Sequence, residues 1–267
     1  MHDGDAAEAR DELRVVSSPS ESDRFGFGVG RLSVPACVDS FDEVARALDR
    51  APDLDLVVVR YAADHVGWFA HLEAIAGHAA LHADTLQYWT KPVTPTSPAR
   101  PADVARARRG TSEDAALLAA LVADVFASYR NHYAANPLIA ADDALAGYVE
   151  WAGGFLDPAQ SSRHVLFAEQ DGSAVGIAAV ATEDDVLEIV LAGVASAARR
   201  SGVYAALLRD IEDLASDLGM RTVTISTQAH NTAVMRAWAR HGFLPDHTIE
   251  TVHLVHRAAL EAWNAPS

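Results

Sequence analysis

The chain has 267 residues, of which half are hydrophobic, and a formal net charge of −16. This acidity argues against a surface for nucleic acid or anionic lipid, and a single cysteine, Cys37, excludes a disulfide framework or a cysteine-based zinc site. No apolar run approaches the roughly 20 residues of a membrane helix, and the N-terminus lacks the apolar core of a signal peptide. We therefore expect a soluble cytoplasmic protein without nucleic-acid or membrane partners. The sequence leaves a homodimer open.

The N-terminal part of the chain predicts a small α/β domain over residues 24–90, after a polar, acidic tail over residues 1–23 that we expect to be disordered. Strands are expected at 25–34, 54–60 and 83–89 because these runs are apolar and β-branched or aromatic. A helix capped by Ser40 and a helix over 65–77 separate them. The Pro-rich stretch 91–102 is predicted to be a linker.

The second predicted domain covers residues 103–256, with a C-terminal tail over 257–267. Its first helix is expected to have Ser112 at the N-cap and acidic residues in its first turn. The dipeptide Asp171-Gly172 predicts the turn of a hairpin. A segment rich in polar aromatic residues precedes that hairpin, and a strand over 247–255 ends the domain.

The segment 186–243 alternates between strands and helices without interruption. Val186–Val194 is β-branched and apolar with one acid inside it, which predicts a largely buried strand. A helix begins at Val203, and its apolar residues fall on one stripe at helical spacing: Leu207, Ile211, Leu214 and Leu218. A strand over 221–227 and a helix that begins at Asn231 follow, and Gly242-Phe243 ends the segment.

The turn Arg199–Tyr204 predicts a diphosphate site. Its backbone N–H groups would point out of the N-terminus of a helix, where unpaired donors and partial positive charge favour an anion. Gly202 allows close approach of the backbone, and Arg199 and Arg200 add charge. The alternative is an ordinary basic connection between a strand and a helix.

This segment resembles the acyl-CoA site of the GNAT superfamily of N-acetyltransferases. That family has a Q/R-x-x-G-x-G/A phosphate loop after a strand, and later an Asn and a Y-x-x-x-G-F helix. Here Tyr204 replaces the last small residue of the loop, and Trp238 replaces the usual Tyr. The resemblance implies a mixed GNAT sheet flanked by helices and acetyl-CoA as co-substrate, with the thioester carbonyl in the splay after Leu191. The CoA contacts implied are Leu191, Val194, Arg199, Arg200, Ser201, Gly202, Val203, Tyr204, Asn231 and Trp238.

A narrower resemblance extends from about residue 23 onward, to the sugar-nucleotide amine acetyltransferases of the TDP-fucosamine acetyltransferase type. The similar segments are the small α/β domain, the loop FASYRNHYAANPL with its YVEW helix, and the strand end STQAHN. What this resemblance implies is acetyl transfer to an amino group of a nucleotide-linked amino-deoxy sugar. Another small amine, an antibiotic or a peptide remains an alternative acceptor, and so does a degenerate module that binds acyl-CoA for regulation.

Two residues are candidates for the proton transfers. Glu188 lies inside the apolar strand, where burial would raise its pKa and suit it as a general base; a solvated acid at the end of a strand is the alternative. The indole of Trp238 can donate a hydrogen bond but no proton at neutral pH. Tyr204 is a substitute for the acid, but a thiolate with a pKa of about 8.5 hardly needs one, so the sequence leaves the acid unassigned. Packing in the core is the other role for Trp238, and the N-cap of a helix is the other role for Asn231.

Polar aromatic residues and an amide suggest where the acceptor binds. His132, Tyr133, Asn136, Tyr148 and Trp151 lie in the segment that shapes the acceptor pocket of GNAT enzymes, and aromatic faces and amide edges suit a sugar ring. Packing over the sheet is the alternative for each of them. No histidine spacing indicates a metal site, and direct attack of the amine on the thioester requires no metal.

Overall fold

The computed structural model describes residues 13–94 and 104–264 and divides the chain into two compact units. The first unit comprises the chain up to Thr85, Asn131–Ala140, and the chain from Thr248 onward; the second comprises Leu86–Arg130 and Ala141–His247. Two long strands, β4 (His78–Pro92) and β10 (Leu244–His256), each run from one unit into the other. The units are therefore discontinuous in sequence, in contrast to the predicted order of one domain after the other.

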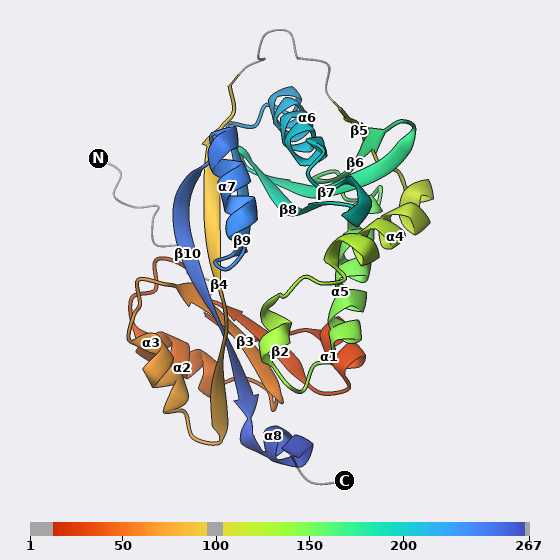
Figure 1. The fold of residues 1–267 in the computed structure, drawn as a ribbon. Coiled ribbons are helices and arrows are strands. Elements are labelled where there is room, and N and C mark those ends of the chain that lie inside the picture. The colour runs from red at the N-terminus through yellow and green to blue at the C-terminus, as the bar shows by residue number, and fades with distance from the viewer. Residues whose placement is uncertain (1–12, 95–103, 265–267) are drawn as a thin grey trace, which may run out of the picture. The chain divides into compact units, whose positions relative to one another are not determined.

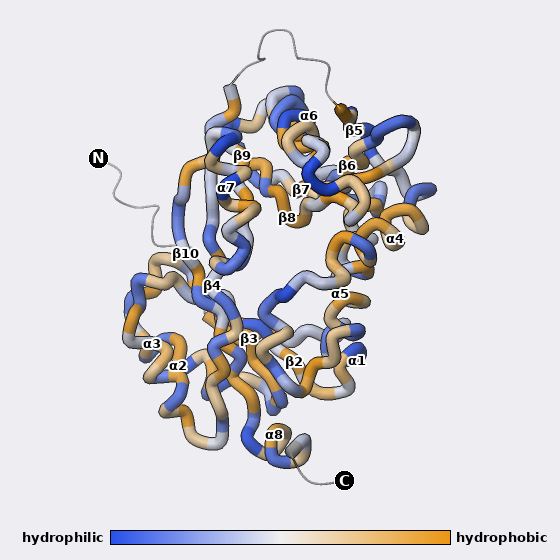
Figure 2. Tube along the Cα trace, viewed as in Figure 1, coloured by the Kyte–Doolittle hydropathy of each residue, from blue (hydrophilic) through white to orange (hydrophobic). Residues whose placement is uncertain are grey.

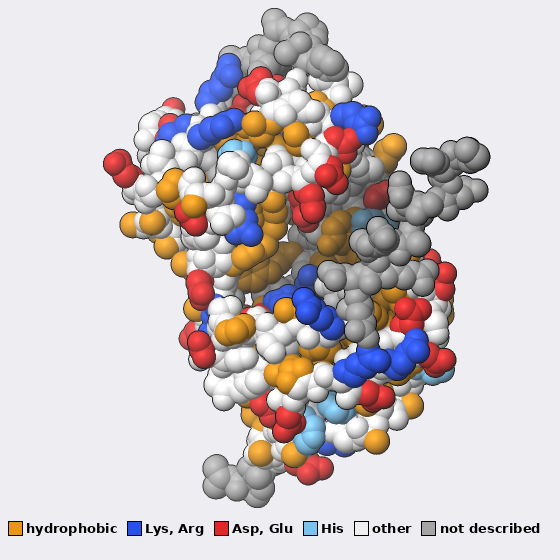
Figure 3. Space-filling view, turned by 180° about the vertical axis from the view of Figure 1, so that it is seen from behind, with side chains coloured by type: hydrophobic (Ala, Val, Ile, Leu, Met, Phe, Trp, Pro, Cys, Tyr) orange, Lys and Arg blue, Asp and Glu red, His pale blue; other side chains and the backbone are white. Residues whose placement is uncertain are grey.

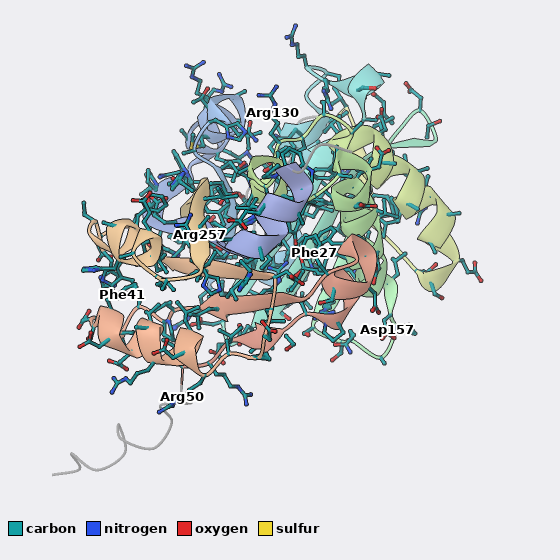
Figure 4. All side chains as sticks on the ribbon, turned by 90° about the horizontal axis from the view of Figure 1, so that it is seen from below. Phe27, Phe41, Arg50, Arg130, Asp157 and Arg257 are labelled. Carbon is teal, nitrogen blue, oxygen red and sulfur yellow. The ribbon has the colours of Figure 1, made fainter. Side chains whose placement is uncertain are left out.

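The first unit is the smaller α/β part, built on the strand order β1-β2-β3-β10. β2 (Val29–Ser33) and β3 (Leu56–Ala62) are parallel, whereas β1 (Val16–Ser17) and β10 pair antiparallel to their neighbours. α2 (Phe41–Asp49), which Ser40 caps as predicted, lies between the labelled residues Phe41 and Arg50 in Figure 4. Apolar residues of α2, α3 (Trp68–Glu73) and the strands form one core.

The expected disorder through residue 23 differs from the structure, in which α1 (Pro19–Phe25) follows β1. An ion pair to a buried carboxylate holds this helix: Arg31 donates to Glu21 at 2.8 Å through Nε and 2.5 Å through Nη2. The Tyr133 hydroxyl also donates to Glu21, which is only 5% exposed. The sequence does not indicate these partners, because Glu21 is one acidic residue among several in this segment. Residues 1–12 lie outside the described residues.

The second unit has the strand order β4-β9-β8-β7-β6-β5 and includes the segment 186–243 (Figure 1). Its strands are β5 (Arg106–Arg109), β6 (Arg163–Gln170), β7 (Ser173–Glu183), β8 (Val186–Val194) and β9 (Thr222–Gln228). Only β8 and β9 are parallel. This mixed sheet agrees with the predicted fold class, and β8 has the predicted bounds.

Helices cover both faces of this sheet. One face packs against α6 (Val203–Asp217) and α7 (Thr232–His241), and the other packs against α4 (Ala115–Phe126), α5 (Ala141–Gly153) and the short helix η3 (Gly154–Leu156). Hydrophobic residues follow β7, β8 and most of α4 in Figure 2. A strand buried on both faces must be apolar on both faces, as β8 is.

Several boundaries differ from the sequence prediction. The cap near residue 112 is Thr111, which forms a capping box with Asp114 at the start of η1 (Ser112–Asp114), so Ser112 is not the N-cap. Lys91 and Pro92 extend β4, and the rest of the predicted linker beyond residue 94 lies outside the described residues. The predicted C-terminal tail contains α8 (Arg257–Asn264). The Asp171-Gly172 turn is confirmed, with φ of 52° and 78°.

Candidate active site

The site is organised by the point at which β8 and β9 stop pairing. Their parallel register runs from Val186 opposite Thr222 to Ile189 opposite Ile225, and it ends there although both strands continue. The divergence therefore begins after Ile189, two residues earlier than the expected position after Leu191. Beyond it, β8 presents backbone groups that β9 does not satisfy, and these are available to a ligand that lies between the strands.

A β-bulge lies at the same point. β7 pairs with Ile189 through Val180 and with Leu191 through Ala179, so Val190 has no partner. Because an extra residue shifts the alternation of side chains, Val190 and Leu191 both pack in the core on the α4–α5 face, whereas Ile189 and Ala192 pack toward α6. Sequence alternation could not reveal this shift, since β8 is apolar on both faces.

The end of β8 and the following turn are tied to α4. A Cβ on Gly193 would meet Val125 Cγ1 at 2.2 Å, so only glycine permits this close approach of the helix. Asp124 accepts hydrogen bonds from the Ser196 N–H at 2.8 Å and hydroxyl at 2.9 Å, which lower the pKa of the Asp124 carboxyl. Arg199 donates to the carbonyls of Val194 and Val125. The turn that leads to α6 is therefore held in place.

The predicted phosphate loop has the expected geometry. Gly202 is the N-cap of α6 with φ of 90°, and no side chain caps the helix. Arg200 also has a positive φ, 64°, and is exposed. Since the N–H groups of a first turn lack partners within the helix, α6 presents its donors beside a glycine and an exposed guanidinium. Ser201 donates to the Ala198 carbonyl at 2.6 Å, which orders the turn itself.

Trp238 and Tyr204 form a hydrogen bond that joins α7 to α6. The indole N–H of Trp238, which is 1% exposed and packs against Trp89, donates to the Tyr204 hydroxyl oxygen at 2.8 Å. Because an indole is only a donor, the Tyr204 oxygen accepts this bond and its own proton is left to donate elsewhere. Burial raises the pKa of Tyr204 to about 12; the hydrogen bond from Trp238 lowers this pKa in part, and Tyr129 raises it slightly. Tyr204 therefore stays protonated at neutral pH.

A second group of polar side chains lies at the end of β9, where that strand no longer pairs with β8. Tyr129, which follows α4, donates to the Gln228 side-chain oxygen, and its hydroxyl lies 3.4 Å from that of Thr227. Asn231 occupies the N-cap position of α7, but its amide donates to Thr227 at 3.0 Å and does not cap the helix. Sequence reasoning did not single out Tyr129, although it is part of the FASYR loop.

Glu188 is half-buried on β8, one residue before the last residue that pairs with β9. The alternation of the strand puts Glu188 and Val190 on the same face, about 7 Å apart at the Cα atoms. Burial raises the pKa of the Glu188 carboxyl, and the neighbouring charge of Glu183 raises it further. A carboxylate with a raised pKa next to the bulge has the properties of a general base.

The five predicted acceptor residues fall into two groups. Tyr148 and Trp151 lie on α5 in the second unit, where their rings contact each other edge to face at 6.2 Å and Trp151 is 45% exposed. His132, Tyr133 and Asn136 are buried in the first unit, at or beside η2 (His132–Ala135). The acceptor role of all five residues stays a prediction.

Hydrogen bonds fix the proton positions of the buried histidine pair in the first unit. Asn136 donates to Nδ1 of His253 at 3.3 Å, so His253 carries its proton on Nε2 and donates to Nδ1 of His132 at 2.8 Å. Burial, with the charges of Arg31 and Arg60, lowers the pKa of His253 to about 3 and that of His132 well below its usual range. Both rings are neutral at pH 7.

The described residues were also compared with what metal sites, membrane helices and nucleic-acid surfaces require. Among residues 13–94 and 104–264, no group of three or more His, Cys, Asp or Glu side chains is arranged to hold a metal ion. Within the same residues, no helix is long and apolar enough to cross a membrane. Acidic and basic side chains are interspersed on the part of the face in Figure 3 that the described residues form.

A parallel strand pair that diverges beside an uncapped helix N-terminus, in a mixed sheet with helices on both faces, is the fold of acyl-CoA N-acyltransferases. The model of the acetyltransferase (GNAT) family matches residues 122–243. The chain is therefore similar to GNAT acetyltransferases over this segment, which is somewhat less than half of its length. Nearly all of the matched segment lies in the second unit; residues 131–140 belong to the first.

Solved structures share the fold over most of the chain. A GCN5-related N-acetyltransferase from Kribbella flavida is 17% identical with a TM-score of 0.57, over 86% of this chain and 81% of that one. A GCN5-related N-acetyltransferase from Sphaerobacter thermophilus is 15% identical with a TM-score of 0.57, over 90% and 74%. A conserved protein of unknown function from Staphylococcus epidermidis is 10% identical with a TM-score of 0.54, over 93% of both chains. No curated protein matches the sequence.

The phosphate loop can be tested with two substitutions at one position. Gly202→Ala and Gly202→Glu both force a side chain onto a backbone with φ of 90°, which costs about 1 kcal/mol in either variant. Only Gly202→Glu adds a charge and bulk where the diphosphate would lie. We expect acetyl-CoA to raise the melting temperature of the wild type and of Gly202→Ala, and to bind Gly202→Glu at least about tenfold more weakly, a loss of about 1.4 kcal/mol.

Thermal-shift titration with acetyl-CoA measures both effects, because the unliganded melting temperatures report the shared strain separately. An equal ligand response in Gly202→Glu and Gly202→Ala would show that the diphosphate does not lie at this helix terminus.

Proposed function

We propose that the protein transfers the acetyl group of acetyl-CoA to a primary amine, most suitably an amino group of a nucleotide-linked amino-deoxy sugar. The use of acetyl-CoA is supported by the end of β8–β9 pairing at Ile189, beside the uncapped N-terminus of α6. The sugar acceptor rests on the resemblance of the FASYR loop, the YVEW helix and the STQAHN strand end to sugar-nucleotide acetyltransferases. The phosphates would bind the loop, and the pantetheine arm would run along β8 toward the bulge.

The reaction is a direct acyl transfer. The neutral amine attacks the thioester carbonyl carbon, the C–S bond breaks, and the amine loses one proton while the thiolate of CoA departs. Negative charge develops on the carbonyl oxygen in the tetrahedral intermediate, and a backbone N–H of β8 next to Val190, unpaired on the β9 side, would stabilise it. Such donors are already oriented by the strand, so little reorganisation accompanies the reaction.

Glu188 is the proposed general base. Its raised pKa favours proton acceptance from an ammonium near neutral pH, and it lies on the face that also carries Val190. With about 7 Å between the Cα positions, the carboxylate can take the proton directly or through one water. Removal of the proton is required because a protonated amine has no lone pair with which to attack.

Tyr204 is the proposed hydrogen-bond donor to the departing thiolate. Its pKa of about 12 lies well above the roughly 8.5 of a thiol, so full proton transfer from the phenol to the thiolate would be unfavourable. The bond from Trp238 leaves the phenol proton free to stabilise the sulfur as a donor. The phenol that other GNAT enzymes have on the last helix would thus be supplied here from α6.

The acceptor class can be tested by comparing amines. If the acceptor is a sugar nucleotide, TDP- or UDP-linked amino-deoxy sugars should be acetylated with kcat/KM at least about a hundredfold above that of the free amino sugars, since binding of the nucleotide orients the amine. Polyamines, aminoglycosides and lysine peptides complete the panel, with CoA release as the readout. Equal rates with and without the nucleotide would refute the sugar-nucleotide acceptor but not the acetyl transfer.

Substitution of Glu188 tests the base. Glu188→Gln preserves the shape of the side chain and removes proton acceptance, so the rate below the pKa of the amine should fall by about 10²–10⁴-fold with little change in acetyl-CoA affinity. Raising the pH should partly restore the rate, because more of the amine is then already neutral. The measurement is the pH profile of kcat/KM for both proteins.

The control for this substitution is stability. A carboxyl whose pKa is raised in the folded state favours folding below its unfolded pKa, and this contribution is lost as the pH rises through the folded value. Glu188→Gln should therefore be at least as stable as the wild type at pH 7. Activity within a few-fold of the wild type at every pH would make Glu188 a solvated strand acid, and lost CoA affinity or stability would make it structural.

A further inference from the structure

This inference concerns the end of the route that the acyl group would take, and it rests on the proposed binding of acetyl-CoA between β8 and β9. A pantetheine arm that runs from the loop along β8 reaches the bulge at Val190, where the strands rejoin through Ile189 and Ile225. The acyl chain cannot continue in the plane of a paired sheet. It must turn onto one of the two faces.

The α6–α7 face is closed. Ile189 and Ile225 are 2% and 3% exposed, and the core above them includes Trp238 and Phe243, each 1% exposed. A chain of additional methylenes would have to displace close-packed side chains there, which costs about 1–3 kcal/mol or more. The acyl chain is therefore directed to the other face.

On the α4–α5 face the chain meets three aromatic rings. Phe126 of α4 and Tyr148 of α5 are stacked at 5.3 Å with an interplanar angle of 12°. Tyr129 lies edge to face against both, at 5.4 Å from Phe126 and 6.3 Å from Tyr148. All three belong to the core cluster that includes Leu191 or pack against it, as does Val190. The bulge and the aromatic rings thus share one cluster.

Tyr129 is fixed at both ends. Its ring packs in this cluster, whereas its hydroxyl donates to Gln228 and lies 3.4 Å from the Thr227 hydroxyl, both on the part of β9 that β8 has left. Thr227 and Gln228 are 4% and 5% exposed, so the phenol hydroxyl of Tyr129 is held by buried partners. The side chain consequently reaches from the core beside β8 to β9, across the place where the strands diverge.

We propose that Tyr129 sets the maximum length of the acyl group. A methyl group, as in acetyl, fits between the bulge and the phenol, whereas a chain of four or more carbons would collide with a ring that its own hydrogen bond holds in place. Because a site that cannot accommodate one extra methylene rejects it by about tenfold or more, the enzyme would accept acetyl and propionyl groups and exclude longer ones.

Acyl-CoA binding tests this without knowledge of the acceptor. Isothermal titration with CoA and with acetyl-, propionyl-, butyryl- and hexanoyl-CoA should give the wild type similar Kd values up to propionyl, and values at least about tenfold weaker for butyryl and hexanoyl. Tyr129→Ala should bind all five within about threefold of one another. Tyr129→Phe keeps the ring and should keep the exclusion of hexanoyl-CoA.

Tyr88→Ala is the matched control, because Tyr88 is a tyrosine of the same unit that stacks on His247 at 4.4 Å, away from the cluster. It should leave the wild-type series unchanged. If circular dichroism shows that Tyr129→Ala is unfolded, Tyr129→Leu replaces it, with the same expectation. Wild-type binding of hexanoyl-CoA as tight as acetyl-CoA, or unchanged discrimination in folded Tyr129→Ala or Tyr129→Leu, overturns the proposal. Absence of binding by every thioester and by CoA overturns the proposed function as well.

Discussion

The structure depends on one constraint, which is that β8 and β9 are parallel for only four residue pairs and then separate while each remains covered by helices. Separation leaves the backbone groups on that side of β8 without β9 as their partner, which makes them available to a ligand. The bulge at Val190 fixes the position of the separation by changing the phase of the strand. The remaining features of the site are arranged relative to this point.

Two sets of contacts maintain the separation. On the β8 side, Asp124 and Arg199 tie the turn after β8 to α4, and Gly193 allows the helix to approach. On the β9 side, Tyr129 holds Gln228, and Asn231 holds Thr227. β9 remains an ordered strand beyond its last pair with β8 because β4 pairs with it as far as Gln228, and these side-chain hydrogen bonds fix the polar groups at its end.

The fold of the second unit was predictable from the sequence to a large extent, because strand and helix periods alternate clearly from Val186 to Phe243. The divergence point was not predictable, since β8 is apolar on both faces and no alternation marks the extra residue. Neither was the discontinuous division into units, because β4 and β10 read as ordinary strands. Tyr129 was overlooked for a related reason: its importance comes from Gln228, 99 positions further along the chain.

The central claim is that the thioester carbonyl binds the backbone of β8 at the bulge. Comparison of backbone amide ¹H–¹⁵N shifts in the complexes with acetyl-CoA and with CoA tests it directly, because the two ligands differ only in the acetyl group. The account predicts that the largest differences occur at the amides of Val190 and Leu191, while the amides of residues 200–204 shift equally with both ligands. Equal spectra at Val190 and Leu191, or differences concentrated elsewhere, would contradict it.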